Sequence, residues 1–159
     1  MTKIKVLFVC LGNICRSPAA EAVFLKLISE KGVEDNFLVD SAGTGSWHEG
    51  KKADSRMIYA ALSRGITIES HARQIKKTDF EKFNYILTMD NSNFHNVINL
   101  KNRESLNCIS EILKIQSFAS RFEADEVPDP YFGGDEGFDN VLDILEDSVS
   151  NFLKSIYQT

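Results

Sequence analysis

Residues 6–18 read VLFVCLGNICRSP, and this stretch decides both the expected fold and the expected site. Its first four residues form an apolar run that is typical of a buried parallel strand. Ser17 is a favourable helix cap, and Pro18 fits the first turn of a helix, where a missing N–H costs nothing. Gly12 allows the backbone to curl so that successive amides point inward. The stretch therefore predicts a strand, a loop and a helix whose N-terminus binds an anion such as phosphate.

Two side chains make this predicted phosphate site a candidate for catalysis. Cys10 ends the predicted strand and faces the loop, where a positive field would hold its sulfur as the reactive thiolate. Arg16 follows six residues later, and its planar guanidinium matches two oxygens of a tetrahedral anion. A thiolate below a phosphorus atom, with donors around the oxygens, suits in-line displacement of a leaving group. The alternative is a buried strand cysteine beside a loop that only turns.

The composition is typical of one soluble domain, which we expect to span residues 1–159. No apolar run approaches the ~18 residues that a membrane helix needs, so no membrane partner is expected. The formal net charge of −5 argues against a nucleic-acid partner. The three cysteines are an odd number, which does not make a disulfide framework and predicts a reducing cytoplasm. The three histidines are too scattered for a metal motif.

Apolar periodicity predicts strands that alternate with helices. Strands are expected at residues 6–9, 37–39 and 85–89 and around Leu113 and Ile115. Helices are expected from residue 18 to about Gly32, at 56–64, around Phe94 to Ile98, at 103–110 and from Phe138 to Ile156. This order predicts an α/β fold with an open, parallel, four-stranded sheet and helices on both faces. In such sheets ligands bind beyond the carboxyl ends of the strands, which is where Cys10 lies.

Asp129 is the second catalytic candidate. A phosphocysteine intermediate needs an acid for the leaving oxygen and then a base for water, and one carboxyl group can serve both steps. Pro130 stiffens the backbone that carries this carboxyl group. Asp-Pro also commonly starts a turn, and the dipeptide alone favours that simpler interpretation.

Three aromatic residues, Trp47, Tyr131 and Phe132, lie in segments that are otherwise polar and rich in glycine. Aromatic walls around a phosphate site would grip a phenyl ring and set a depth that suits phosphotyrosine better than phosphoserine. For Trp47, packing onto the core is the competing interpretation. Cys15 shares the loop with Cys10 and could trap an oxidised nucleophile as a disulfide, or it could simply fill space under the helix.

Nearly the whole chain resembles the low-molecular-weight protein tyrosine phosphatases. The resemblance is carried by residues 6–18 with Ala20-Glu21-Ala22, by 40–44 with Trp47-His48, and by 72–75, 79–80, 85–90 and 129–134. It implies a flavodoxin-like, single-domain hydrolase of phosphoric monoesters that uses no metal or cofactor. The implied substrates are a phosphotyrosine protein or a small aryl phosphate, and the implied product is inorganic phosphate.

The same resemblance implies a role for each residue of the site. Cys10 would be the nucleophile, Arg16 the phosphate clamp and Asp129 the general acid and base. Ser41 would support the shape of the loop, and Ser17 would stabilise the departing thiolate. The phosphate-binding residues would be Leu11, Gly12, Asn13, Ile14, Cys15 and Ser17. The family often has tyrosine where Phe132 stands here, which removes a hydroxyl and leaves the apolar wall.

Three other functions compete with this one. Thioredoxin-coupled arsenate reductases relay oxidation through two further cysteines, whereas only Cys108 lies beyond the loop here. Related arginine phosphatases tend to have threonine at the position of Ile14, and isoleucine favours phosphotyrosine instead. A phosphate-binding module or a phosphocysteine carrier would have no use for Asp129, since a carboxylate that activates water would destroy the stable phosphocysteine.

Overall fold

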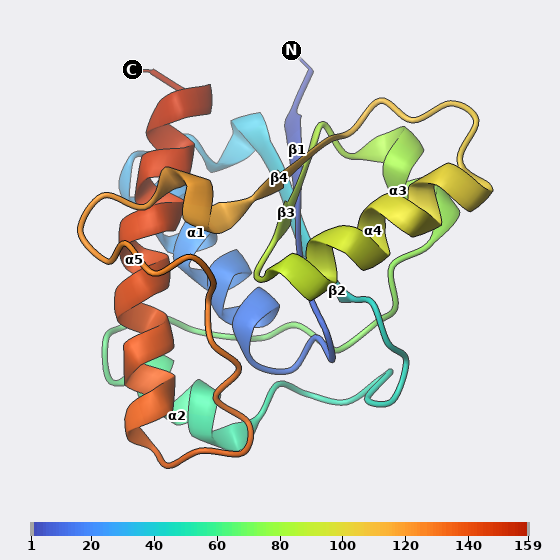
Figure 1. The fold of residues 1–159 in the computed structure, drawn as a ribbon. Helices are drawn as coiled ribbons and strands as arrows, with labels where there is room; N and C mark the ends of the chain where they lie inside the picture. Colours follow the sequence, from blue (N-terminus) through green and yellow to red (C-terminus); the bar gives the residue numbers. More distant parts are fainter. Residues whose placement is uncertain (1, 159) are drawn as a thin grey trace.

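Four parallel strands form the sheet of this protein in a computed structural model that describes residues 2–158 (Figure 1). They are β1 (Ile4–Cys10), β2 (Phe37–Gly43), β3 (Tyr85–Thr88) and β4 (Glu111–Lys114). Their order across the sheet is β2-β1-β3-β4, and each neighbouring pair is parallel. The expected α/β fold with an open parallel sheet is therefore confirmed.

Helices cover both faces of the sheet, as Figure 1 shows. On one face lie α1 (Arg16–Glu30), α2 (Ser55–Leu62) and the long α5 (Glu136–Ile156). On the other face lie α3 (Lys77–Lys82) and α4 (Asn91–Glu104). Two short 3-10 helices, Glu34–Asn36 and Ile115–Phe118, complete the described elements.

The central strand β1 separates two hydrophobic cores because successive side chains of a strand point to opposite faces. Val6 and Phe8 join the core under α1 and α5, whereas Leu7 and Val9 join the core under α3 and α4. All four side chains are fully buried. This explains why the buried part of β1, residues 6–10, is a continuous apolar run without alternation.

Some local expectations were wrong. Helix α1 begins at Arg16 with Cys15 as its cap, so Ser17 lies inside the first turn and its hydroxyl is used elsewhere. Strand β4 ends at Lys114, and Ile115 opens a 3-10 helix. The expected helix at 103–110 does not form beyond Glu104, because the backbone becomes extended at Ser105.

Helix α3 was not predicted because its six residues are too few to show a helical period. It begins where the Asp79 carboxylate accepts a hydrogen bond from the Lys76 backbone N–H at 2.9 Å. No helix within residues 2–158 is long and apolar enough to cross a bilayer.

Candidate active site

The loop between β1 and α1 is held from outside by its carbonyl groups. The Leu11 carbonyl accepts a hydrogen bond from the Gly45 N–H at 2.9 Å, and the Ile14 carbonyl accepts one from the Asp54 N–H at 2.8 Å. Within residues 2–158, the backbone N–H groups of Gly12, Ile14 and Cys15 donate to no other protein atom. With the carbonyls engaged outside, these N–H donors remain available for an anion at the start of α1.

Asn13 fixes the curl of this loop. It has a φ of 57°, which places its backbone in the left-handed region that asparagine tolerates better than most residues do. Its side-chain nitrogen donates to the Ser17 hydroxyl at 2.7 Å and to the Ser41 hydroxyl at 3.0 Å. Its side-chain oxygen accepts the Arg73 backbone N–H at 3.0 Å. Every polar atom of this buried side chain is therefore bonded, which offsets the cost of the left-handed backbone.

The Cys10 sulfur lies at the base of the loop, where its side chain is 2% exposed. The Asn13 backbone N–H donates to it at 3.3 Å, and the Ser17 hydroxyl lies 3.0 Å from it. Both groups are hydrogen-bond donors that can reach the sulfur.

Arg16 lies beside the same cavity with a buried guanidinium. One terminal nitrogen donates to the Asp90 carboxylate at 2.6 Å and to the Val127 carbonyl at 3.0 Å. The other lies 3.7 Å from the Asp129 carboxylate. Burial lowers the pKa of Arg16, but Cys10 and Asp90 outweigh this effect, so its pKa is raised and its charge is secure.

Asp90 is a positioning residue whose role was not predicted. Its carboxylate also accepts the Asn93 N–H at 2.7 Å, so it caps α4 while it orients Arg16. Asp90 follows β3 closely, and β3 lies next to β1. The sequence did contain a signal for this role, since Asp90 comes just after a predicted strand. Polar residues that follow neighbouring parallel strands meet at the same edge of the sheet.

Asp129 lies on an exposed loop, and its own carboxylate shapes that loop. One oxygen accepts the Tyr131 N–H at 3.1 Å, so the expected turn at Asp-Pro does form. The other oxygen faces Arg16. Arg56 holds the loop from α2, because it donates to the Tyr131 carbonyl at 3.0 Å and lies 5.6 Å from the centre of the Tyr131 ring. Asp129 therefore starts a turn and also directs its carboxylate toward Arg16.

A cavity of about 140 Å³ brings most of the predicted site residues together. It is lined by Cys10, Leu11, Gly12, Ile14, Cys15, Arg16, Trp47, His48, Asp129, Tyr131 and Phe132. The other predicted residues, Asn13, Ser17 and Ser41, do not line it, and their buried side chains form the hydrogen-bond network just described. Trp47 is 68% exposed and Phe132 is 94% exposed, so neither packs onto the core. The aromatic rings stand around the opening of the cavity.

Glu21 lies behind Ser41 and was not predicted as part of the site. Its carboxyl oxygen accepts a hydrogen bond from the Ser41 hydroxyl at 2.6 Å. Burial raises the pKa of Glu21 to about 7, against the opposing effect of the Ser41 bond. A titratable group is therefore joined to the loop through Ser41 and Asn13.

Cys15 is a free thiol, as are the other two cysteines. Burial raises the pKa of Cys15, and the nearby Asp54 raises it further. The thiol of Cys15 is therefore protonated at neutral pH. Among residues 2–158, no group of His, Cys, Asp or Glu has the arrangement of a metal site.

Comparisons with known proteins identify the family of this chain. The family model for low molecular weight phosphotyrosine protein phosphatases matches residues 5–159. A relative of that name from Schizosaccharomyces pombe is 44% identical over 158 residues, which are 98% of this chain and 99% of the relative. A relative of the same name from Sus scrofa is 43% identical over 151 residues, which are 95% of this chain and 94% of the relative.

Solved structures share the fold as well. A protein tyrosine phosphatase from Entamoeba histolytica has a TM-score of 0.89 at 43% identity and covers 97% of each chain. A Drosophila arginine phosphatase has a TM-score of 0.92 at 33% identity, over 98% of this chain and 99% of that one. The family model and these relatives define a phosphatase, an enzyme that hydrolyses phosphoric monoesters. The chain belongs to the low molecular weight phosphotyrosine protein phosphatase family.

Proposed function

We propose that this protein hydrolyses phosphotyrosine in proteins, and small aryl phosphates, through a phosphocysteine intermediate on Cys10. The observation that carries the proposal is that Cys10, Arg16 and Asp129 line one small cavity with aromatic rings around its opening. Residues 1–159 would act as one catalytic domain, and the cytoplasmic location stays a prediction from the cysteine content.

In the first step the Cys10 thiolate attacks phosphorus. The S–P bond forms, the bond from phosphorus to the tyrosine oxygen breaks, and Asp129 gives its proton to that oxygen. Arg16 and the loop N–H groups hold the three non-bridging oxygens and stabilise the charge as it redistributes. The anchoring of Arg16 by Asp90 supports this role, since the guanidinium needs little rearrangement when the phosphate arrives.

In the second step water attacks the phosphocysteine. The Asp129 carboxylate takes a proton from the water, the S–P bond breaks, and inorganic phosphate leaves. The returning negative charge on the Cys10 sulfur is stabilised by the Ser17 hydroxyl at 3.0 Å and the Asn13 N–H at 3.3 Å. Because the thiolate is stabilised, it is a better leaving group in this step.

The test is hydrolysis of p-nitrophenyl phosphate at mildly acidic pH in the presence of EDTA, for the wild type and for Cys10→Ser. Turnover by the wild type that disappears in the variant would support a metal-independent cysteine phosphatase. A folded, reduced wild type without turnover would overturn the proposal and favour a phosphate-binding or phosphate-carrier role.

The likeness to an arginine phosphatase makes phosphoarginine the second candidate substrate. Ile14 lines the cavity with an apolar side chain that offers no hydroxyl to a guanidino leaving group. We therefore expect kcat/KM to be higher for a phosphotyrosine peptide than for a matched phosphoarginine peptide. The reverse order would assign the chain to the second substrate class.

A further inference from the structure

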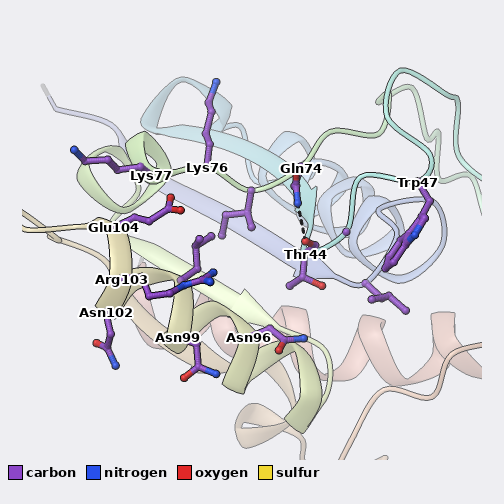
Figure 2. A pocket seen from close by; sticks show the side chains of 14 residues that line it. Thr44, Trp47, Gln74, Lys76, Lys77, Asn96, Asn99, Asn102, Arg103 and Glu104 are labelled. Atoms are coloured by element: carbon purple, nitrogen blue, oxygen red, sulfur yellow. Dashed lines mark hydrogen bonds between the residues drawn. The ribbon is translucent and has the colours of Figure 1, made fainter.

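A second and larger hollow lies beside the catalytic cavity. This groove has a volume of about 880 Å³ and runs between the segment after β2 and the exposed face of α4 (Figure 2). Its size lies within the range of roughly 300–1,000 Å³ that is common for ligand clefts. The groove contains no cysteine, so it does not serve the attack on phosphorus. A role in binding is therefore the one to consider for this groove.

The groove adjoins the catalytic cavity. Leu11 and Trp47 line both hollows, so one wall separates a bound phosphate group from the start of the groove. On the floor nearby, the Gln74 side-chain nitrogen donates to the Thr44 carbonyl at 3.0 Å (Figure 2). A chain that leaves the catalytic cavity across Leu11 therefore enters the groove at once.

The far part of the groove is positively charged, although the protein as a whole has a net charge of −5. Lys76, Lys77 and Arg103 line it, and Glu104 is its one acidic residue. Within residues 2–158, none of these three cations has a carboxylate partner within 4.0 Å. In Figure 2 Arg103 extends from α4 into the groove, and the two lysines stand at its rim. The charges are therefore available to an anionic ligand.

The wall formed by α4 carries amide side chains that are also available. Asn96, Asn99 and Asn102 are exposed and line the groove at a spacing of three residues. Within the described part of the chain, their side chains make no hydrogen bond to another protein group. An asparagine side chain both donates and accepts, so such a row can bind the N–H and C=O groups of an extended peptide.

We propose that this groove binds an acidic segment that flanks the phosphotyrosine of a substrate protein. The Asp and Glu carboxylates of this segment pair with Lys76, Lys77 and Arg103, and the backbone of the segment lies along the asparagines of α4. This inference rests on the proposed function, because the phosphotyrosine side chain must occupy the catalytic cavity. Charge complementarity favours carboxylates over a basic or apolar segment.

The test compares kcat/KM for phosphotyrosine peptides that carry three glutamates before the phosphotyrosine, three after it, or glutamines in their place. At low salt we expect one acidic peptide to exceed its glutamine counterpart by about tenfold, since each exposed ion pair adds a modest gain. In about 0.5 M salt the preference is expected to shrink, because such charges are screened. The variant K76Q/K77Q/R103Q is expected to lose the preference and to retain normal turnover of p-nitrophenyl phosphate.

A matched control removes the same charge elsewhere. Lys3, Lys31 and Lys154 are exposed and lie outside the groove, so K3Q/K31Q/K154Q changes the net charge equally. This control is expected to keep the acidic preference. An equal loss of the acidic preference in both variants would overturn the proposed role of the groove. The preference would then be a long-range effect of net charge.

A measurement on the wild type gives an independent outcome. Addition of the favoured acidic peptide, with a non-hydrolysable phosphonate in place of phosphate, is expected to shift the amide resonances of Asn96, Asn99 and Arg103. Resonance shifts confined to the phosphate loop would overturn the peptide-binding role of the groove but not the proposed function. Normal turnover of phosphotyrosine peptides with no acidic preference would do the same. Failure to hydrolyse any phosphotyrosine peptide would instead overturn the proposed function, and the inference with it.

Discussion

The phosphate loop at 11–15 and the loop that carries Asp129 face the same cavity but are held in opposite ways. The first is held by buried groups, such as the fully bonded side chain of Asn13, which is 2% exposed. The second is held at the surface, where Asp129 is 42% exposed and Arg56 is the contact from α2. The phosphate is the same in every substrate, whereas the leaving group varies. A rigid site suits the constant group, and a surface loop suits the variable one.

The largest effect on turnover is expected from a substitution at the buried phosphate loop and its arginine. Arg16→Lys should lower kcat/KM for p-nitrophenyl phosphate by about 10³-fold, because a point charge cannot replace the two-pronged guanidinium on phosphate and Asp90. Arg64→Lys is the matched control, since Arg64 bonds to Asp143 and Glu146 on the surface of α5. We expect the control to keep normal turnover. Near-normal turnover in Arg16→Lys would remove Arg16 from the phosphate site.

On the exposed loop that carries Asp129, the effect of a substitution on turnover should depend on the leaving group. Asp129→Ala is expected to lower kcat by about 10³-fold for phenyl phosphate and about 10²-fold for p-nitrophenyl phosphate, because a good leaving group needs less protonation. Asp125→Ala is the control, an exposed acid that does not line the catalytic cavity. An equal loss for both substrates would argue against Asp129 as the acid.

The rigidity of the phosphate loop is tested at Asn13. Asn13→Ala loses three hydrogen bonds, two of them buried, and keeps a left-handed backbone. We expect unfolding to become easier by about 2–4 kcal/mol and kcat/KM to fall about tenfold. Asn13→Gly should recover about 1 kcal/mol of this in urea unfolding, since glycine tolerates the positive φ. Identical stability of the two variants would show that strain has no part in the loss.

Behind the loop, at Glu21, we expect an effect on the pH dependence of stability rather than on turnover. Its pKa is raised from 4.5 to about 7 because it is buried, so the folded protein binds this proton more tightly than the unfolded chain does. The corresponding stability is fully present below about pH 4.5 and is lost as the pH rises through about 7.

Glu21→Gln removes this titration and keeps an oxygen for Ser41. From about pH 5 to about pH 8, the wild type should lose about 2–3 kcal/mol of unfolding free energy relative to the variant. Urea unfolding of both proteins across this range measures the difference. Parallel curves would show that Glu21 does not carry the pH dependence.

The same contrast explains how much the sequence could predict. The pattern of apolar runs was enough for the parallel sheet, and the strand, the glycine and the helix start around Cys10 and Arg16 predicted a phosphate loop. The bond from Asp90 to Arg16 could not be read locally, because it depends on β3 lying beside β1. The hydroxyl of Ser17 was expected to cap α1, but the sulfur of Cys10 lies within its reach instead. Such choices between partners are settled by tertiary packing rather than by residue preference.

Gly43 shows that a position can control the chemistry without contributing a side chain. A Cβ atom at this position would lie 2.7 Å from the Leu11 carbonyl oxygen and 3.1 Å from the Asn13 nitrogen, both of them backbone atoms of the phosphate loop. Neither can yield as a flexible side chain would, so even alanine would push the loop out of shape. An inventory of reactive groups omits this residue, yet its smallness is as much a requirement of the enzyme as the sulfur of Cys10.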